Sequence, residues 1–442
     1  MADSDNHVTP RLVELYRRWS ESGAGLLLSG NMQVDRLHLE RPGNVVLDGA
    51  AGADALARLA TAGKARGAHF WAQLSHAGRQ VSESINPSPL APSSVKLDFQ
   101  LRFAGYVFGT PTQMTEGDIA NAIAQFASAA QQVRAAGFSG LQIHGAHGYL
   151  ISQFLSPLVN RRADRWGGSL SNRSRLLFEV LTAVREAVGP AFPVGLKLNA
   201  SDFQVGGFTN VECIELVRAL NNFSLDLLEL SGGSLEQPKV VGVALKDQGV
   251  DGQRGKTAQR EAYFIEFAGA VRAAAAMPVM VTGGFRTAAA MVAALEAGEL
   301  DVVGLGRPLI TDPLAPARLL QGDASIASRA AESLAVFYVP AWFNIQLERL
   351  ADGLDADLSL GGAEAGAMFK EIERQMTAAL LARRKNVAFK APPGLDLASR
   401  LRPGGPFARL GHVLVQWLRR PADAVMLLVK HAMVNLARRR FG

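Results

Sequence analysis

The chain has 442 residues, of which 48% are hydrophobic, and a formal net charge of +6. This length allows one large domain with a smaller appendage. Its one cysteine, Cys213, excludes an internal disulfide, a cysteine-ligated iron–sulfur cluster and a zinc site built from several thiolates. The sequence has no run of about 18 uncharged apolar residues and no signal-like start, so we expect a cytoplasmic protein.

Seven short runs rich in leucine and β-branched residues alternate with longer amphipathic stretches, which predicts a parallel sheet with helices outside. The expected strands are residues 25–29, 69–73, 140–144, 194–199, 225–230, 279–282 and 302–305. The expected helices are residues 53–66, 116–136, 172–188, 209–221, 258–275 and 287–297. Two connections, 74–115 and 231–257, are long enough to shape a substrate pocket.

This alternation fits either an open doubly wound sheet or a (β/α)8 barrel. The candidate ligand residues favour the barrel, because they stand at the ends of many successive strands: Gly30, Gln73, His144, Lys197, Gly284 and Gly306. A barrel gathers all its strand ends on one active face, whereas an open sheet binds its ligand at one switch point. We therefore predict an α/β fold of the TIM type.

The C-terminal part departs from the strand and helix alternation. We predict a helical region at 325–350, a linker at 354–366 and a helix at 367–384. The chain is accordingly divided into a barrel with its terminal helix (1–350), a linker and helix (351–385) and a C-terminal tail (386–442).

The tail carries the positive charge of the chain. It holds ten Lys and Arg against two Asp, a net +8, which leaves about −2 for the preceding residues. A basic stripe across the main domain, typical of nucleic-acid enzymes, is lacking, so we expect no nucleic-acid partner. Residues 426–436 are apolar apart from the interrupting Lys430 and His431, and the three arginines 438–440 follow. This pattern suits either peripheral contact with a membrane or a helix docked on the barrel with a solvated basic end.

The most informative stretch covers residues 137–179, GFSGLQIHGAHGYLISQFLSPLVNRRADRWGGSLSNRSRLLFE. His144 and His147 leave the end of a strand and can donate hydrogen bonds to a carbonyl or phenolate oxygen, while Tyr149 can supply a proton from another direction. Such a set is suited to reducing an activated alkene. Taken alone, the pair His144 and Tyr149 would more simply be packing residues.

The same stretch resembles the central signature of the Old Yellow Enzyme family of FMN-dependent NADH:flavin oxidoreductases. The shared pattern is His-x-x-His-Gly-Tyr, then Ser-Pro-x-x-Asn-Arg-Arg-x-Asp, an aromatic residue, Gly-Gly-Ser and Asn-Arg. The likeness extends over about residues 11–350. It implies that Tyr149 is the proton donor and that His144 and His147 hold the substrate oxygen.

A second motif, residues 278–313, reads PVMVTGGFRTAAAMVAALEAGELDVVGLGRPLITDP. Glycines at two strand ends let backbone N–H groups approach a phosphate, and barrels often bind phosphate after strands seven and eight. The candidates are Gly283, Gly284, Gly306 and Arg307, whose guanidinium can add a charge-assisted contact. The resemblance implies that the phosphate is that of FMN.

Four further positions match flavin-binding residues of the family. The resemblance places Gln73 at the pyrimidine edge of the isoalloxazine, Gly30 and Asn31 against the ring, and Lys197 near its N1 and O2 atoms, where a cation stabilises the anionic reduced flavin. A buried lysine with no anion beside it is costly, which supports this role for Lys197. The implied cofactors are FMN and NADH or NADPH, and no metal is expected.

One departure from the family concerns the start of the chain. The family's first strand, with its Ala-Pro-Met-type turn, would precede Met1, so we expect a barrel that lacks strand 1 and hypothesise a truncated form. The resulting function hypothesis is an NAD(P)H-dependent ene-reductase that acts on α,β-unsaturated carbonyls, quinones or related small-molecule electrophiles, with homo-oligomerisation left open. The alternative is a catalytically silent barrel that serves as a binding or membrane-associated scaffold.

Overall fold

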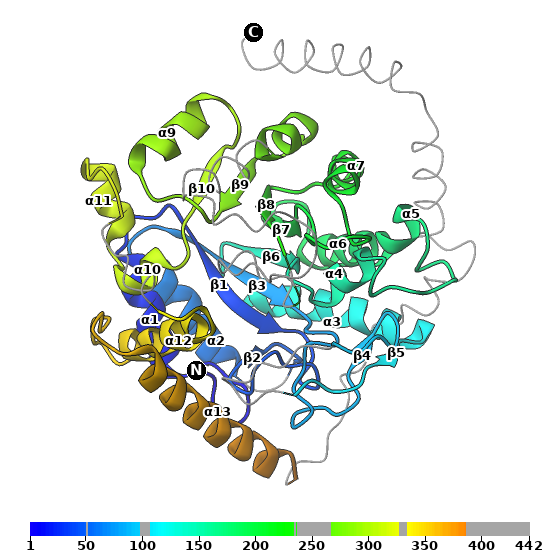
Figure 1. The fold of residues 1–442 in the computed structure, drawn as a ribbon, viewed down its shortest axis with the longest axis horizontal. Coiled ribbons are helices and arrows are strands. Elements are labelled where there is room, and N and C mark those ends of the chain that lie inside the picture. Colours follow the sequence, from blue (N-terminus) through cyan, green and yellow to red (C-terminus); the bar gives the residue numbers. More distant parts are fainter. Residues whose placement is uncertain (50–51, 98–106, 234–235, 237–266, 327–333, 386–442) are drawn as a thin grey trace. The chain divides into compact units, whose positions relative to one another are not determined.

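The computed structural model describes residues 1–49, 52–97, 107–233, 236, 267–326 and 334–385 (Figure 1). All of them belong to one compact unit within residues 1–395. The basic tail, with the helix expected there, and most of the long connection 231–257 lie outside the described residues. No helix among the described residues is long and apolar enough to cross a membrane.

Seven main strands run parallel in one curled sheet, as the sequence predicts. They are β1 (Leu26–Gln33), β3 (His69–Ser75), β6 (Gly140–Gly145), β7 (Val194–Asn199), β8 (Leu227–Ser231), β9 (Val279–Thr282) and β10 (Val302–Gly304). A two-residue strand, β2 (Val45–Val46), pairs with the end of β1 and completes the order β10-β9-β8-β7-β6-β3-β1-β2. A separate pair, β4 (Leu90–Ala91) and β5 (Thr112–Gln113), lies in the first long connection.

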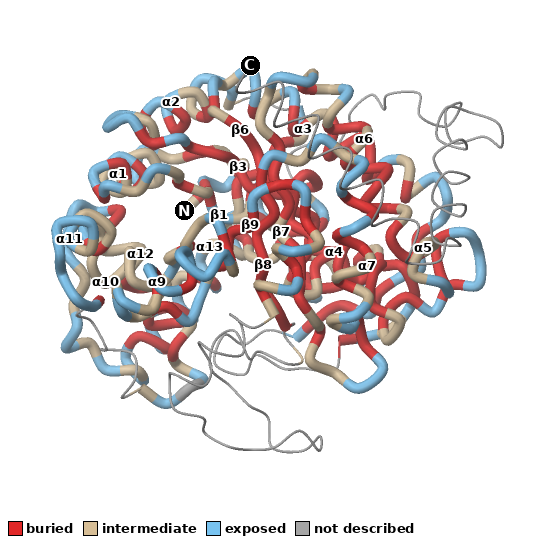
Figure 2. The backbone as a smooth tube through the Cα atoms, turned by 90° about the horizontal axis from the view of Figure 1, so that it is seen from above, coloured by how far each residue is buried: buried red, intermediate tan, exposed pale blue. Residues whose placement is uncertain are grey.

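The curled sheet is open on one side. Within the described part of the chain, β10 pairs with β9 alone, and β1 pairs with β2 and β3 but not with β10. The prediction of an α/β fold of the TIM type is confirmed by this curled parallel sheet. Figure 2 shows the buried residues concentrated along the strands β3, β6, β7, β8 and β9.

Helices follow the strands and cover the outer face of the sheet (Figure 1). They are α2 (Ala53–Gly63), α3 (Glu116–Ala135), α4 (Leu150–Leu155), α5 (Leu170–Arg173), α6 (Arg175–Val188), α7 (Asn210–Leu220), α9 (Ala288–Glu296), α10 (Pro308–Thr311) and α11 (Ala315–Gln321). The single helix predicted at 172–188 is divided at Ser174, which caps both α5 and α6. Of the helix predicted at 258–275, residues 267–274 are described and helical.

One N-terminal helix, α1 (Pro10–Ser20), was not predicted, although its start signals are present. The Thr9 side chain accepts the Leu12 N–H as an N-cap, and Pro10 occupies the first turn, where its missing N–H costs nothing. Its buried Tyr16 packs on Phe70 of β3, with ring centroids 4.7 Å apart.

Two helices end the described chain: α12 (Val339–Ala351), which follows the short 3-10 helix η3 (Val336–Tyr338), and α13 (Gly362–Lys385). They pack against each other through Trp342, Ile345 and Phe369. Because α13 begins at Gly362, the linker is shorter than the predicted 354–366. Helix α13 matters for the site, since it also contacts the segment between β1 and β2 through an ion pair between Arg41 and Glu373.

Candidate functional site

The inside of the curled sheet changes from apolar to polar along its strands. Nearer the strand starts, Trp71, Leu227 and Met280 form a buried cluster. Two residues further along, polar side chains take over, with Gln73 after Trp71 and Glu229 after Leu227. Because alternate strand residues face the same side, these polar groups face the interior toward the C-terminal ends, where barrel enzymes bind their ligands.

The polar side chains are connected to one another by hydrogen bonds. Gln73 Nε2 donates to Gln142 Oε1 over 2.7 Å, and Gln142 Nε2 donates to Glu229 Oε2 over 2.7 Å. Lys197 Nζ donates to Glu229 Oε1 over 2.8 Å. The two predicted flavin residues, Gln73 and Lys197, are therefore brought together through Gln142 and Glu229, which the sequence analysis missed.

Lys197 has an anion beside it, contrary to our expectation from the sequence. Glu229 is only 1% exposed and neutralises the ammonium within the protein itself. The sequence could have indicated this inward position. Glu229 alternates with Leu227 and Ser231 along β8, and alternate residues of a strand face the same side. The ammonium has three N–H donors, and the bond to Glu229 uses one of them.

The three predicted catalytic side chains lie together. The His144 ring meets the rings of His147 and Tyr149 edge to face, with centroid distances of 5.0 Å and 4.9 Å. His144 Nδ1 accepts the Ala146 N–H over 3.2 Å, so the proton of the neutral ring is on Nε2. Burial, with the nearby His147 and Lys197, holds the pKa of His144 well below its usual value. The ring is thus a neutral N–H donor.

His147 is held in an uncommon backbone conformation. Its φ of +60° is in the left-handed region, and two contacts fix it there: its N–H donates to Asn199 Oδ1 over 3.1 Å, and its carbonyl accepts Gln80 Nε2 over 2.8 Å. Nε2 lies 2.6 Å from the Ser231 hydroxyl. Burial, and then Lys197, lower the pKa of His147 to about 3, so this ring is also neutral.

Tyr149 stands at the N-terminus of α4 and is 9% exposed. Its hydroxyl interacts with the Glu40 carboxylate and the Asn31 side chain. Burial, and then Glu40, raise the pKa of Tyr149 well above its usual value, so the phenol keeps its proton. Of the two partners, Asn31 was predicted as a flavin residue and Glu40 was not predicted at all.

Gly30 lies in a bulge of β1, where the register with β3 shifts between Leu28 and Asn31. Its N–H donates to the Tyr16 hydroxyl over 2.8 Å, which occupies that donor. Burial raises the pKa of Tyr16 to about 12. The bulge changes the direction of the end of β1. Asn31, next to Gly30, therefore lies beside Glu40.

The predicted phosphate-binding glycines lie at two neighbouring strand ends. Gly283 and Gly284 follow β9 with φ of +111° and +87°, a region that glycine alone adopts readily. Gly306 and Arg307 follow β10, which pairs with β9 in register up to Gly304 and Thr282. A Cβ added at Gly283 or Gly306 would meet no atom of the described residues within 4 Å, which leaves space for a ligand at both strand ends.

Arg307 lies over an aromatic ring of α12. Its guanidinium carbon lies 5.9 Å from the centre of the Phe343 ring on α12. The donor set of this edge of the sheet is therefore an amide, an ammonium and two neutral imidazoles over the central strands, with glycine N–H groups and a guanidinium at the last two. This set fits a flavin mononucleotide, which presents a polar ring edge and a phosphate.

A buried cluster beside this site, Asp35, His38 and His76, has the composition of a metal site but not its hydrogen bonding. His38 Nε2 and His76 Nδ1 each accept a backbone N–H, from Leu90 and Gly78, so their protons face the Asp35 carboxylate. Metal ligands normally donate from the second ring nitrogen instead. The cluster packs the loop after β3 against the segment after β1.

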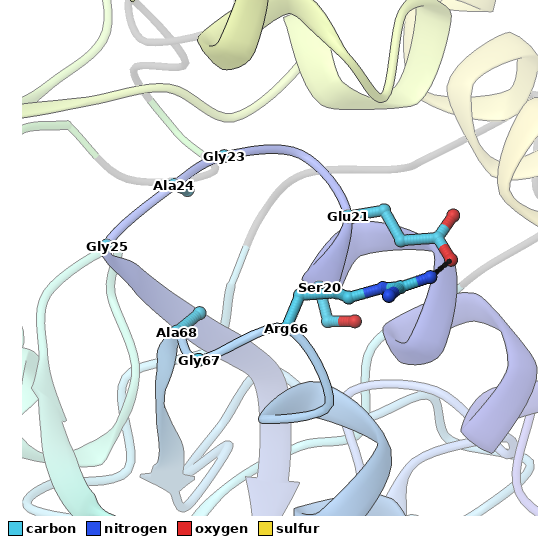
Figure 3. A pocket seen from close by; sticks show the side chains of 8 residues that line it. All are labelled: Ser20, Glu21, Gly23, Ala24, Gly25, Arg66, Gly67 and Ala68. Carbon is cyan, nitrogen blue, oxygen red and sulfur yellow. Dashed lines mark ion pairs between the residues drawn. The ribbon is translucent and has the colours of Figure 1, made fainter.

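A pocket of about 610 Å³ lies away from this site, where β1 and β3 begin (Figure 3). Its lining includes Glu21 and Arg66, which form an ion pair over 3.6 Å. Since barrel enzymes bind their ligands at the opposite ends of the strands, we assign no ligand to it.

The fold and the donor set define a flavin-dependent oxidoreductase of the barrel type. The model of the NADH:flavin oxidoreductase / NADH oxidase family matches residues 1–325, and the chain belongs to this family. Enzyme class and cofactor, FMN with a nicotinamide reductant, are therefore as predicted.

Known relatives agree with this membership. The NADH-dependent flavin oxidoreductase nadA of Aspergillus parasiticus is 37% identical over 317 residues, which cover 70% of this chain and 69% of that protein. A solved complex of 2-naphthoyl-CoA reductase with 2-naphthoyl-CoA has a TM-score of 0.68 and 25% identity, covering 79% of this chain and 54% of that one. Morphinone reductase in complex with tetrahydroNAD has a TM-score of 0.58 and 25% identity, with 73% and 84% covered.

Proposed function

We propose that the protein reduces the carbon–carbon double bond of α,β-unsaturated carbonyl compounds, and that quinones and related electrophiles are further acceptors. The observation that carries this proposal is the edge-to-face contact of Tyr149 with His144, which puts a protonated phenol beside a neutral N–H donor. An alkene conjugated to a carbonyl needs both groups, because its oxygen gains charge while its α-carbon takes a proton. A quinone needs only the first, since its reduced oxygens take protons from solvent.

The residues of the chain have separate tasks in this reaction. His144 and His147 donate N–H bonds to the carbonyl oxygen and so hold the alkene in place. Their lowered pKa values keep both rings neutral, so each ring can donate an N–H without carrying a positive charge. Tyr149 delivers its phenolic proton to the α-carbon. FMN, reduced by NADH or NADPH, supplies the hydride for the β-carbon.

The same structure suggests which residues hold the cofactor. Gln73 and Lys197 would contact the polar edge of the ring, with Asn31 and the bulge at Gly30 beside it. Gly283, Gly284, Gly306 and Arg307 would hold the phosphate. We extend nicotinamide binding to this chain because one structural neighbour was solved with tetrahydroNAD.

The test is Tyr149→Phe in the FMN-loaded protein, with the two half-reactions measured separately by rapid mixing. Loss of a positioned acid should slow reduction of a cyclic enone by about 10²–10⁴-fold. Flavin reduction by NADH or NADPH and turnover of a quinone should stay close to the unmutated rates. Tyr338→Phe, on η3, is the matched control and should change neither half-reaction. Equal losses with enone and quinone would remove Tyr149 from the acid role.

A further inference from the structure

The Glu40 carboxylate is an unassigned group beside the proposed acid. Glu40 lies in the segment that joins β1 to β2, and its Oε2 accepts Asn31 Nδ2 over 2.5 Å. The same carboxylate faces the Tyr149 hydroxyl, and Leu39, its neighbour in the chain, packs in one cluster with Tyr149. One side chain thus links the proposed proton donor to the strand end at which the flavin ring is placed.

The charges around Tyr149 leave this carboxylate as its principal ionic neighbour. Arg41 also faces the phenol, but its guanidinium is paired with Glu373 of α13, with Nη2 2.6 Å from Oε1. On the other side stands the neutral His144 ring. Apolar residues complete the surroundings, among them Leu39 and Leu380.

Tyr149 and Glu40 differ in their exposure to solvent. Tyr149 is buried, whereas Glu40 is half-buried and so reaches solvent more readily. A buried acid that gives up its proton in every turnover must recover one, and it needs a route to water to do so. We propose that Glu40 is a positioning residue for Tyr149, which orients its hydroxyl and returns a proton to it after each reduction. This inference rests on the proposed function.

Water supplies the proton that replaces the one given up by Tyr149. When the new C–H bond forms at the α-carbon, the Tyr149 O–H bond breaks and its electron pair stays on the phenolate oxygen. A hydronium ion protonates Glu40, and the Glu40 O–H proton then passes to the phenolate. Tyr149 and Glu40 return to their starting states, and one solvent proton has reached the substrate.

The decisive variant is Glu40→Gln, which keeps the shape and the Asn31 contact but carries no proton. Enone reduction should slow by about 10–100-fold, part of the contribution of a positioned acid, and should gain a larger solvent isotope effect. Flavin reduction by NADH is the internal reference. Glu40→Asp retains a carboxylate and should restore part of the rate, whereas Glu14→Gln, at an exposed pair on α1, should leave it unchanged.

The ionisation of Tyr149 gives a second test, because a purely structural role of Glu40 would not change the Tyr149 pKa. It can be followed by NMR with 13Cζ-labelled tyrosine, the signal being assigned from its absence in Tyr149→Phe. Removing the neighbouring negative charge should lower the Tyr149 pKa in Glu40→Gln and leave it raised in Glu40→Asp. An unshifted pKa or an unchanged enone rate in Glu40→Gln overturns the role of Glu40. An unchanged enone rate in Tyr149→Phe would instead refute the proposed function.

Discussion

Lys197 and Glu229 form a buried ion pair that is complete without a cofactor. The side chain of Lys197 is 14% exposed and that of Glu229 is 1% exposed. Removing one partner of such a pair leaves an uncompensated charge in the interior, which costs more than the pair itself contributes. The lysine therefore has a structural task in addition to the flavin contact that we propose for it.

We expect Lys197→Met to lower the free energy of unfolding of the flavin-free protein by about 3–5 kcal/mol, because Glu229 is left buried and unpaired. The double variant Lys197→Met with Glu229→Gln removes both charges and should recover most of this loss. Urea denaturation followed by circular dichroism measures both. A single variant as stable as the unmutated protein would mean that water or another cation compensates Glu229.

At the scale of residues, the sequence predicted groups that stand close together in the chain and missed those that the fold brings in. His144, His147 and Tyr149 come from one stretch of six residues, so a motif was enough to find them. Glu40 comes to the same place from the segment between β1 and β2, and Ser231 from the end of β8. Their distance from the motif in sequence, and not any weakness of their contacts, hid them.

At the scale of elements, the strands were predicted well because each is a short apolar run between turn signals. Helix ends were predicted less accurately. The division at Ser174 is an example, because a serine cap inside an amphipathic stretch does not interrupt its apolar pattern. The docking of α13 was not predictable, because its partner surface lies some 300 residues earlier in the chain. Arg384 near its end donates to the Ile85 carbonyl over 3.0 Å.

Leu380 on α13 gives a test of this docking. It is 3% exposed and shares an apolar cluster with Leu39, Ile85 and Tyr149. Leu380→Ala should destabilise the protein by about 2–5 kcal/mol, the usual cost of a cavity at a buried leucine. Because Tyr149 borders that cavity, enone turnover should fall as well.

The matched control is Met368→Ala on the same helix, whose side chain is 44% exposed and should change stability by less than about 0.5 kcal/mol. Denaturant titration of the two variants compares them directly. If Leu380→Ala is as mild as Met368→Ala, α13 is not docked over the Tyr149 cluster.

At the scale of the whole molecule, the alternation of strands and helices predicted the parallel sheet and its order. Closure could not be read from that pattern, because strand pairing between the first and last strands depends on tilt and stagger, which leave no mark on local hydrophobicity. The prediction of an open side rested on the family resemblance. The described sheet, in which β10 and β1 do not pair, agrees with it.

The stability of the whole molecule should depend on pH through Glu179. This residue of α6 is 8% exposed, and its Oε2 has no hydrogen-bond partner among the described residues. Burial raises the pKa of Glu179 from 4.5 to about 7, against the opposing charges of Arg175 and Arg165. The folded protein thus binds this proton more tightly than the unfolded chain does. The free energy of unfolding should therefore fall as pH rises from 4.5 to 7.

Glu179→Gln cannot ionise and should escape this loss. At pH 8 the variant should be more stable than the unmutated protein by up to about 3 kcal/mol, the equivalent of the full shift, and the difference should shrink toward pH 5. Glu186→Gln, at an exposed position of the same helix, is the control and should show no such trend. Thermal or urea unfolding of the three proteins between pH 5 and pH 8 measures the differences. A gap between Glu179→Gln and the unmutated protein that stays constant with pH would mean that Glu179 ionises in the folded protein as it does in the unfolded chain.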